Sequence, residues 1–163
     1  MKRLKIGTPW NALLCLLLVP AAWGQQPTAK APPLACAEAS AMTPAHLYGT
    51  WTLTLWRPEG SESAPLSTGT LRFERHPDYP GSVRGHLQRT AAGGSVPALV
   101  SGDVIDGEFN LDESADGIAI DAVWAGVPQD CGQTLRGTRR PAERPGQALE
   151  PLQFLLRKSP GWH

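Results

Sequence analysis

From Tyr48 to Lys158 apolar residues recur at every second position, and this pattern constrains the fold more than any other feature of the chain. In the first such segment Trp51, Leu53 and Leu55 alternate with threonines. A strand with one buried and one solvated face has this period, because successive side chains point to opposite faces. The pattern predicts eight strands, over residues 49–56, 68–75, 82–89, 98–105, 108–115, 118–126, 133–139 and 151–158.

Most of these segments follow one another closely, and two of the connections are Asp-Gly pairs, Asp106-Gly107 and Asp116-Gly117. A type I′ hairpin turn needs positive φ at both central residues, which Asp tolerates and Gly favours. We therefore expect two-residue hairpins that join 108–115 to the segments on either side of it.

A row of eight antiparallel strands has two unpaired edges, and pairing the last strand with the first removes both. The chain is therefore predicted to be all-β, an eight-stranded antiparallel up-and-down barrel. The alternative is an immunoglobulin-like β-sandwich. The disulfide of that fold joins two strands across the core, whereas Cys36 precedes the first predicted strand.

The N-terminus has the order of a secretory signal peptide. Lys2, Arg3 and Lys5 precede an apolar run over residues 12–19, and small residues lead to Gly24. This order predicts cleavage after Gly24 and a periplasmic or secreted mature protein. The apolar run is too short to span a bilayer, so no transmembrane segment is expected.

The predicted organisation has four parts. Residues 1–24 are the signal peptide, and residues 25–47, rich in Ala, Pro and Thr, form an extended, partly disordered lead-in. Residues 48–158 form the barrel domain, and 159–163 are a C-terminal tail. A short helical turn is expected within 40–47, before the first strand.

The net charge of the mature chain limits the classes of partner that it can bind. Removal of 24 of the 163 residues leaves 139, with 12 basic and 15 acidic side chains and a net charge of −3. Sequence-independent nucleic-acid binding needs a basic surface, so no nucleic-acid partner is expected. We expect one domain and a monomer.

Two cysteines, Cys36 and Cys131, remain in the mature chain. An isolated pair outside the cytoplasm predicts one disulfide. The alternative is a redox or metal site, but the chain has no Cys-x-x-Cys pattern, and His46 is the one histidine within ten residues of either cysteine.

The first predicted strand opens with Gly49-Thr50-Trp51, a Gly-x-Trp sequence. On this motif the chain resembles the calycin group, which includes lipocalins, avidins and small bacterial metalloprotease inhibitors, over Tyr48 to Lys158. The resemblance implies that Trp51 plugs one end of the barrel and that a late-strand arginine, Arg157 or Arg139, stacks on it. The polar residues with which avidins hold biotin are not matched, so biotin is not implied.

An acidic stretch over residues 103–121 contains seven carboxylates and no Lys or Arg. The segment 112–117 is similar to the start of a calcium-binding loop, but position 123, where its terminal Glu belongs, is Val. We predict a solvated acidic face and no metal site. The arginines at 136, 139, 140 and 144 are expected to pair with these acids across the surface, with anion binding as the alternative.

Catalysis has little support in the sequence. The four histidines are scattered, and there is no Gly-x-Ser-x-Gly nucleophile motif. A carboxylate pair for glycosidic cleavage stays open, although nothing selects two of the many acids. We expect no enzyme activity and no cofactor.

The predicted interior is dry. An eight-stranded barrel is filled by its own side chains or holds one small ligand. Because almost no polar residue falls on the inward rows, any internal ligand is expected to be small and apolar. The plug and interior residues are predicted to include Trp51, Leu53, Phe73, Phe109, Trp124 and Phe154.

These features favour an exported, non-enzymatic binding protein of the cell envelope that acts on a protein or small apolar ligand through its loops or open end. One alternative is a protease inhibitor that inserts the segment 25–45 into an active site. Another is a structural envelope component without a small ligand.

Reduction of the predicted Cys36–Cys131 disulfide is expected to lower the melting temperature substantially. The bond would close a loop of 95 residues, and the chain-entropy contribution of such a loop is about 4–5 kcal/mol. Thermal unfolding with and without reductant measures the effect. An unchanged melting temperature would show that the two cysteines are not bonded.

Overall fold

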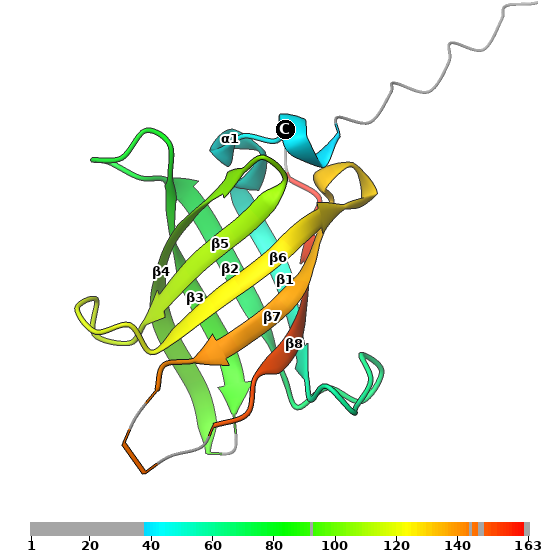
Figure 1. The fold of residues 1–163 in the computed structure, drawn as a ribbon, viewed down its shortest axis with the longest axis vertical. Helices are drawn as coiled ribbons and strands as arrows, with labels where there is room; N and C mark the ends of the chain where they lie inside the picture. The colour runs from blue at the N-terminus through cyan, green and yellow to red at the C-terminus, as the bar shows by residue number, and fades with distance from the viewer. Residues whose placement is uncertain (1–37, 92, 144, 147–148, 162–163) are drawn as a thin grey trace, which may run out of the picture. The chain divides into compact units, whose positions relative to one another are not determined.

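The computed structural model describes residues 38–91, 93–143, 145–146 and 149–161, and within them eight strands form one sheet. Each strand pairs antiparallel with the next along the chain, and β8 also pairs with β1, so the sheet closes on itself (Figure 1). The predicted eight-stranded up-and-down barrel is confirmed. The strands are β1 (Gly49–Trp56), β2 (Ser67–Arg75), β3 (Val83–Ala91), β4 (Gly94–Ile105), β5 (Glu108–Ser114), β6 (Ala122–Gln129), β7 (Thr134–Pro141) and β8 (Leu152–Lys158).

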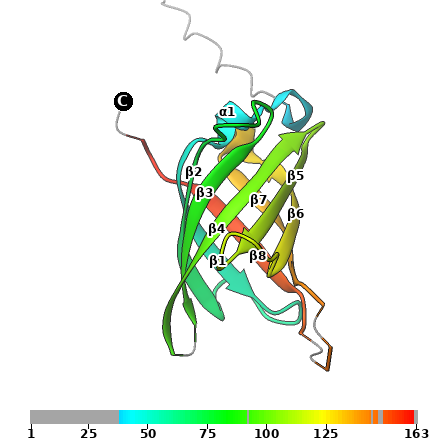
Figure 2. The same cartoon turned by 90° about the vertical axis from the view of Figure 1, so that its left-hand side faces the viewer.

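Within the described residues, helical structure is limited to three short elements, η1 (Ala39–Ala41), α1 (Pro44–Leu47) and η2 (Asp130–Gly132). All three lie at one end of the barrel, which we call the closed end, while the connections after β1 and β7 lie at the opposite, open end (Figures 1 and 2). No helix in the described ranges has the length and apolar character needed to cross a membrane.

The turn between β4 and β5 is the predicted Asp-Gly hairpin. Asp106 and Gly107 have φ of 51° and 83°, the positive values that a type I′ turn requires. The sequence therefore specified this connection correctly.

The second Asp-Gly prediction is wrong, because β5 ends at Ser114 and β6 begins only at Ala122. Asp116 instead accepts hydrogen bonds from the backbone N–H groups of Ile118 (2.8 Å) and Ala119 (2.9 Å). An Asp side chain bonded to the backbone two residues onward builds its own turn. It holds a seven-residue loop over 115–121, and Ile118, predicted to be in a strand, is 90% exposed.

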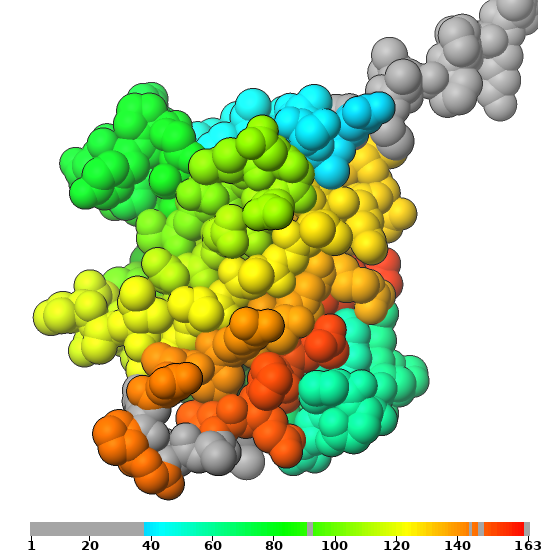
Figure 3. Space-filling view, in the orientation of Figure 1, coloured from blue at the N-terminus to red at the C-terminus, as the bar shows by residue number. Residues whose placement is uncertain are grey.

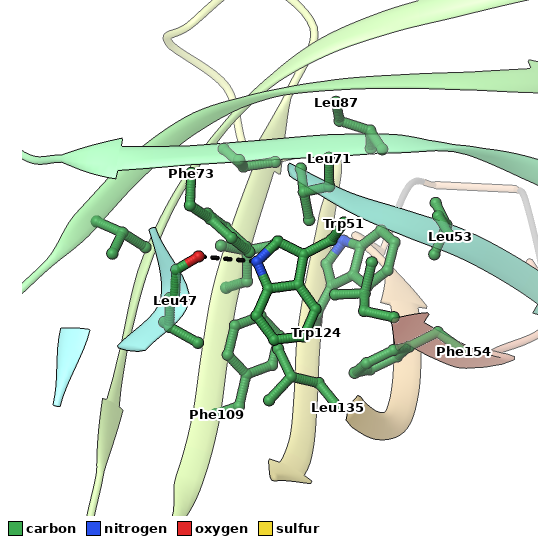
Figure 4. Packing of buried hydrophobic residues seen from close by; sticks show 14 of the residues in the cluster. Leu47, Trp51, Leu53, Leu71, Phe73, Leu87, Phe109, Trp124, Leu135 and Phe154 are labelled. Atoms are coloured by element: carbon green, nitrogen blue, oxygen red, sulfur yellow. Dashed lines mark hydrogen bonds between the residues drawn. The ribbon is translucent and has the colours of Figure 1, made fainter. Parts of the chain in front are cut away.

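The closed end is sealed by α1 and Trp51. The Trp51 indole Nε1–H donates to the backbone carbonyl of Leu47, at 2.7 Å, and both side chains are completely buried (Figure 4). This bond satisfies the polar atom of the indole and fixes α1 across the barrel mouth.

Aromatic rings fill the lumen from the closed end inward. Trp51, Phe73, Phe109 and Phe154 contact one another in sequence with centroid separations of 6.1–6.4 Å and edge-to-face geometry. Phe154 then packs on Trp124 at 5.1 Å, with the rings tilted (Figure 4). These arrangements are the ones that ring quadrupoles favour. The closed half of the interior is therefore a packed apolar core.

Glycines allow neighbouring strands to approach closely where the barrel bends. A Cβ added at Gly137 would lie 2.0 Å from the backbone oxygen of Ala125, and one at Gly85 would lie 2.2 Å from that of Arg72. The obstacle in both cases is backbone of the adjacent strand, which cannot move aside as a side chain can.

Gly137→Ala is therefore expected to lower the free energy of unfolding by at least 1–3 kcal/mol, the usual cost of overpacking. Urea unfolding followed by tryptophan fluorescence measures the loss. Gly81→Ala is the matched control, because a Cβ there meets no atom within 4 Å. Equal stability of the two variants would contradict the close approach of β6 and β7.

Candidate functional site

A cavity of about 520 Å³ lies at the open end of the barrel. Eight apolar residues line it together with six charged ones. The apolar residues are Leu66, Val96, Pro97, Ala98, Ala115, Pro141, Leu149 and Leu152, and the charged ones are Arg57, Arg89, Glu113, Asp121, Arg139 and Glu150. The mixture provides apolar surface with a few polar groups, which is the composition of a small-molecule site.

The base of the cavity is built around the carboxylate of Glu113, whose side chain is only 3% exposed. Arg139 donates to both of its oxygens, from Nε at 2.7 Å and from Nη2 at 2.9 Å. The indole Nε1–H of Trp124 donates to Oε2 at 3.0 Å. Glu113 and Arg139 thus form a bidentate ion pair, the strongest geometry for these groups.

Arg89 is a second guanidinium beside the same carboxylate, but it is poorly satisfied. Its Nη2 lies 3.5 Å from Oε1 of Glu113, at the limit of a hydrogen bond. Its Nε is buried and has no hydrogen-bond partner among the described residues. We call Arg89, Glu113 and Arg139 the charged base of the cavity.

The environment keeps Glu113 ionised. Burial by itself would raise the pKa of this carboxyl, but the hydrogen bonds and charge of Arg139, the charge of Arg89 and the hydrogen bond from Trp124 outweigh it. The pKa of Glu113 therefore lies below its ordinary value of 4.5. At neutral pH this group accepts hydrogen bonds and holds no proton to donate.

The interior was expected to be dry, with almost no polar residue on its inward rows, and this expectation is wrong at the open end, where Glu113 and Arg139 are buried. On each of β3, β5 and β7 the inward-facing positions are apolar or glycine except the last one, which is charged. The three charged residues are Arg89, Glu113 and Arg139. Antiparallel pairing brings these three row ends to the same end of the barrel. Each charged residue comes two positions after an inward-facing residue, Leu87, Leu111 or Gly137, so following the alternation for one more period would have found it.

The predicted interior residues Trp51, Leu53, Phe73, Phe109, Trp124 and Phe154 are all buried in the lumen. Trp124 differs from the rest, because its ring belongs to the apolar core while its N–H faces the charged base. The tryptophan thus joins the two halves of the interior.

The cation on Trp51 is neither of the predicted arginines but Lys158, whose Nζ lies 5.5 Å from the ring centroid. Trp51 and Lys158 are directly paired across β1 and β8, so their side chains share a face. Arg157, one residue earlier, points outward and binds Glu62 at 2.8 Å. Arg139 lies over Trp124 instead, at 5.8 Å.

The loop between β1 and β2 is held against the outside of the barrel. Glu62 accepts hydrogen bonds from Arg136 (2.9 Å) and Arg157 (2.8 Å). Figure 3 shows this loop, in teal, lying against β8, in red. Hydrogen bonds from Arg157 and Arg136 lower the pKa of Glu62.

Two other predictions concern cysteine and the acidic stretch. Cys131 is disulfide-bonded, but Cys36 lies outside the described residues, so the pairing stays a prediction. Within the described ranges, no three His, Cys, Asp or Glu side chains converge as a metal site would require.

No protein-family model matches the chain, and no curated protein matches it. It is similar to the solved structure of EF1p2_mFAP2b bound to DFHBI, with 18% identity and a TM-score of 0.47, over 71% of this chain and 95% of that one. A likeness at this level carries no argument about function. The calycin resemblance therefore stays a prediction, and the barrel itself is established by its strand pairing.

Glu113→Gln is expected to lower the free energy of unfolding by about 3–5 kcal/mol at pH 7, because it leaves the buried guanidinium of Arg139 and the half-buried one of Arg89 without a carboxylate. The pKa of Glu113 is lower in the folded than in the unfolded chain. The contribution of ionised Glu113 to stability is therefore present above about pH 4.5, and it is lost as the pH falls through the pKa that Glu113 has in the folded chain. Urea unfolding at pH 7 and pH 3 should show the gap between variant and wild type narrowing in acid.

Glu74→Gln is the control for this measurement. Glu74 binds Arg84 at 2.8 Å on the outer surface, where both side chains are 42–52% exposed. Exposed pairs of this kind contribute about 1 kcal/mol or less. Similar losses in the two variants would argue against a buried charged base.

Proposed function

We propose that the chain is an exported, non-enzymatic binding protein that holds a small ligand in the open end of its barrel. The observation that carries this proposal is the cavity of about 520 Å³ above the charged base. Its volume falls within the range of about 300–1,000 Å³ that is typical of ligand sites.

The division of the lumen supports a ligand site at this end alone. At the closed end Trp51 and α1 cover the aromatic core, whose residues are fully buried. At the open end Leu66 and Leu149 line the cavity and are also more than half exposed. Apolar side chains that face both a cavity and solvent offer a ligand surface area to cover.

The charges in the cavity suit binding better than proton transfer. A general acid or base needs a pKa near the operating pH, whereas the pKa of Glu113 is lowered and both of its oxygens accept hydrogen bonds from Arg139. The buried carboxylate is therefore a fixed acceptor that orients the surrounding guanidinium groups.

Export is supported by the basic, apolar and small-residue order of residues 1–24. On this proposal the barrel works in the periplasm or outside the cell, where a Cys36–Cys131 disulfide would persist. Protease inhibition by segment 25–45 and a structural role remain predictions, since residues 25–37 lie outside the described part of the chain.

Filling the cavity is expected to abolish ligand binding without unfolding the barrel. Ala98 lines the cavity from β4, so Ala98→Phe should reduce binding of a fluorescent probe at least tenfold. The probes are anionic 8-anilinonaphthalene-1-sulfonate and neutral N-phenyl-1-naphthylamine, and wild type should bind at least one of them with 1:1 stoichiometry.

Ala125→Phe is the matched control, because Ala125 is an exposed strand residue and its substitution should leave binding unchanged. Native mass spectrometry of protein purified from its own host gives an independent measurement of a retained ligand. The proposal fails if wild type binds neither probe, or if Ala98→Phe binds as well as wild type.

A further inference from the structure

We propose that the ligand of the open-end cavity is a small amphipathic carboxylate, held by the Arg89 guanidinium at its anionic end and by the apolar wall along its body. This inference rests on the proposed function and names the chemical class of the ligand. It follows from the imbalance of charge at the base of the cavity.

The base holds two guanidinium groups and one carboxylate, which leaves one positive charge in excess. Arg139 is paired with Glu113 through two hydrogen bonds of 2.7 and 2.9 Å, and these two charges compensate each other. The excess charge therefore belongs to Arg89, whose contact with Glu113 is at 3.5 Å.

Arg89 is also deficient in hydrogen-bond acceptors. Its Nε is buried with no partner in the described part of the chain, and a buried donor without an acceptor is costly. Its side chain is 19% exposed and forms part of the cavity wall. An anion in the cavity would compensate the excess positive charge and accept hydrogen bonds from the part of the Arg89 side chain that faces the cavity.

A carboxylate fits this position better than a neutral acceptor does. Its two oxygens match the planar fork of a guanidinium, and hydrogen bonds between ionised partners are about twice as strong as neutral ones. Glu113 shows this geometry within the site, since it binds Arg139 in the same two-pronged way.

The rest of the wall calls for an apolar body. Leu152 and Val96 line the cavity together with Leu66 and Leu149, which are also exposed to solvent. A ligand with a short hydrocarbon portion would cover this surface as its carboxylate reaches Arg89.

The remaining lining charges are one cation, Arg57, and two anions, Asp121 and Glu150. The six charges of the described lining residues therefore sum to zero, while the base formed by Arg89, Glu113 and Arg139 carries one positive charge in excess. Asp121 already accepts a hydrogen bond from the backbone N–H of Ala115, at 2.7 Å. Selectivity for an anion should therefore depend on contact with Arg89 rather than on the field of the whole cavity.

Isothermal titration of the purified protein with three probes of equal chain length tests the proposal. The probes are octanoate, 1-octanol and octyltrimethylammonium, each below its aggregation concentration. Octanoate should bind at least tenfold more tightly than the other two, and acetate, which lacks the apolar body, should bind far more weakly.

Variants of Arg89 locate the effect. Arg89→Gln should weaken octanoate binding by about 10- to 100-fold, as expected for loss of a charged hydrogen bond, and should leave octanol binding within about twofold. Arg89→Lys keeps the charge without the fork and should show an intermediate loss. Arg84→Gln, on the outward face of the same strand, should leave octanoate binding unchanged.

The outcomes separate this inference from the proposed function. Octanol or octyltrimethylammonium binding as tightly as octanoate would overturn the carboxylate while leaving a ligand site in place. Octanoate binding unaffected by Arg89→Gln would also overturn the inference. Saturable binding of none of the probes, including the two fluorescent ones, would remove the proposed function as well. The comparison of probes on wild type needs no variant to fold.

Discussion

The pairing of β8 with β1 is the constraint on which the rest of the structure depends. Six residue pairs, from Trp51–Lys158 to Trp56–Gln153, close the sheet and remove both of its edges. Closure gives every strand an inside and an outside, so each second side chain must occupy a lumen of fixed width. Substitutions can change which side chains fill the lumen, but the width of the lumen is set by the closed sheet.

The two ends of the lumen are filled in different ways. At the closed end aromatic rings fill the lumen, and the indole N–H of Trp51 donates a hydrogen bond to the carbonyl of Leu47. At the open end the inward positions carry ionised groups, and space remains between them and the loops. Trp124 lies at the boundary, with its ring against Phe154 and its N–H donated to Glu113.

The sequence predicted the sheet far better than the site, for a physical reason. Alternation repeats over many residues, so eight strands and their closure could be inferred even though β4 and β6 begin away from their predicted starts. The charged base depends on three single residues, each at the end of a row. Such residues resemble solvated strand ends, and only the register of the closed barrel shows that Arg89, Glu113 and Arg139 meet. The error at Asp116 has a similar origin, because a local side-chain hydrogen bond competed with the hairpin.

The charged base is not explained by stability alone. Replacing a buried ion pair by apolar residues of similar volume is often neutral or stabilising, because removing two charges from water costs as much as their attraction returns. Leu or Met at these three positions would therefore fill the open end at little cost beyond the acceptor that the Trp124 indole would lose. The chain instead holds Glu113 with one guanidinium and leaves the second, Arg89, incompletely bonded beside a cavity. One guanidinium of this arrangement is buried and fully bonded, and the other is half-buried with too few acceptors, so an anion that enters the cavity compensates the second charge.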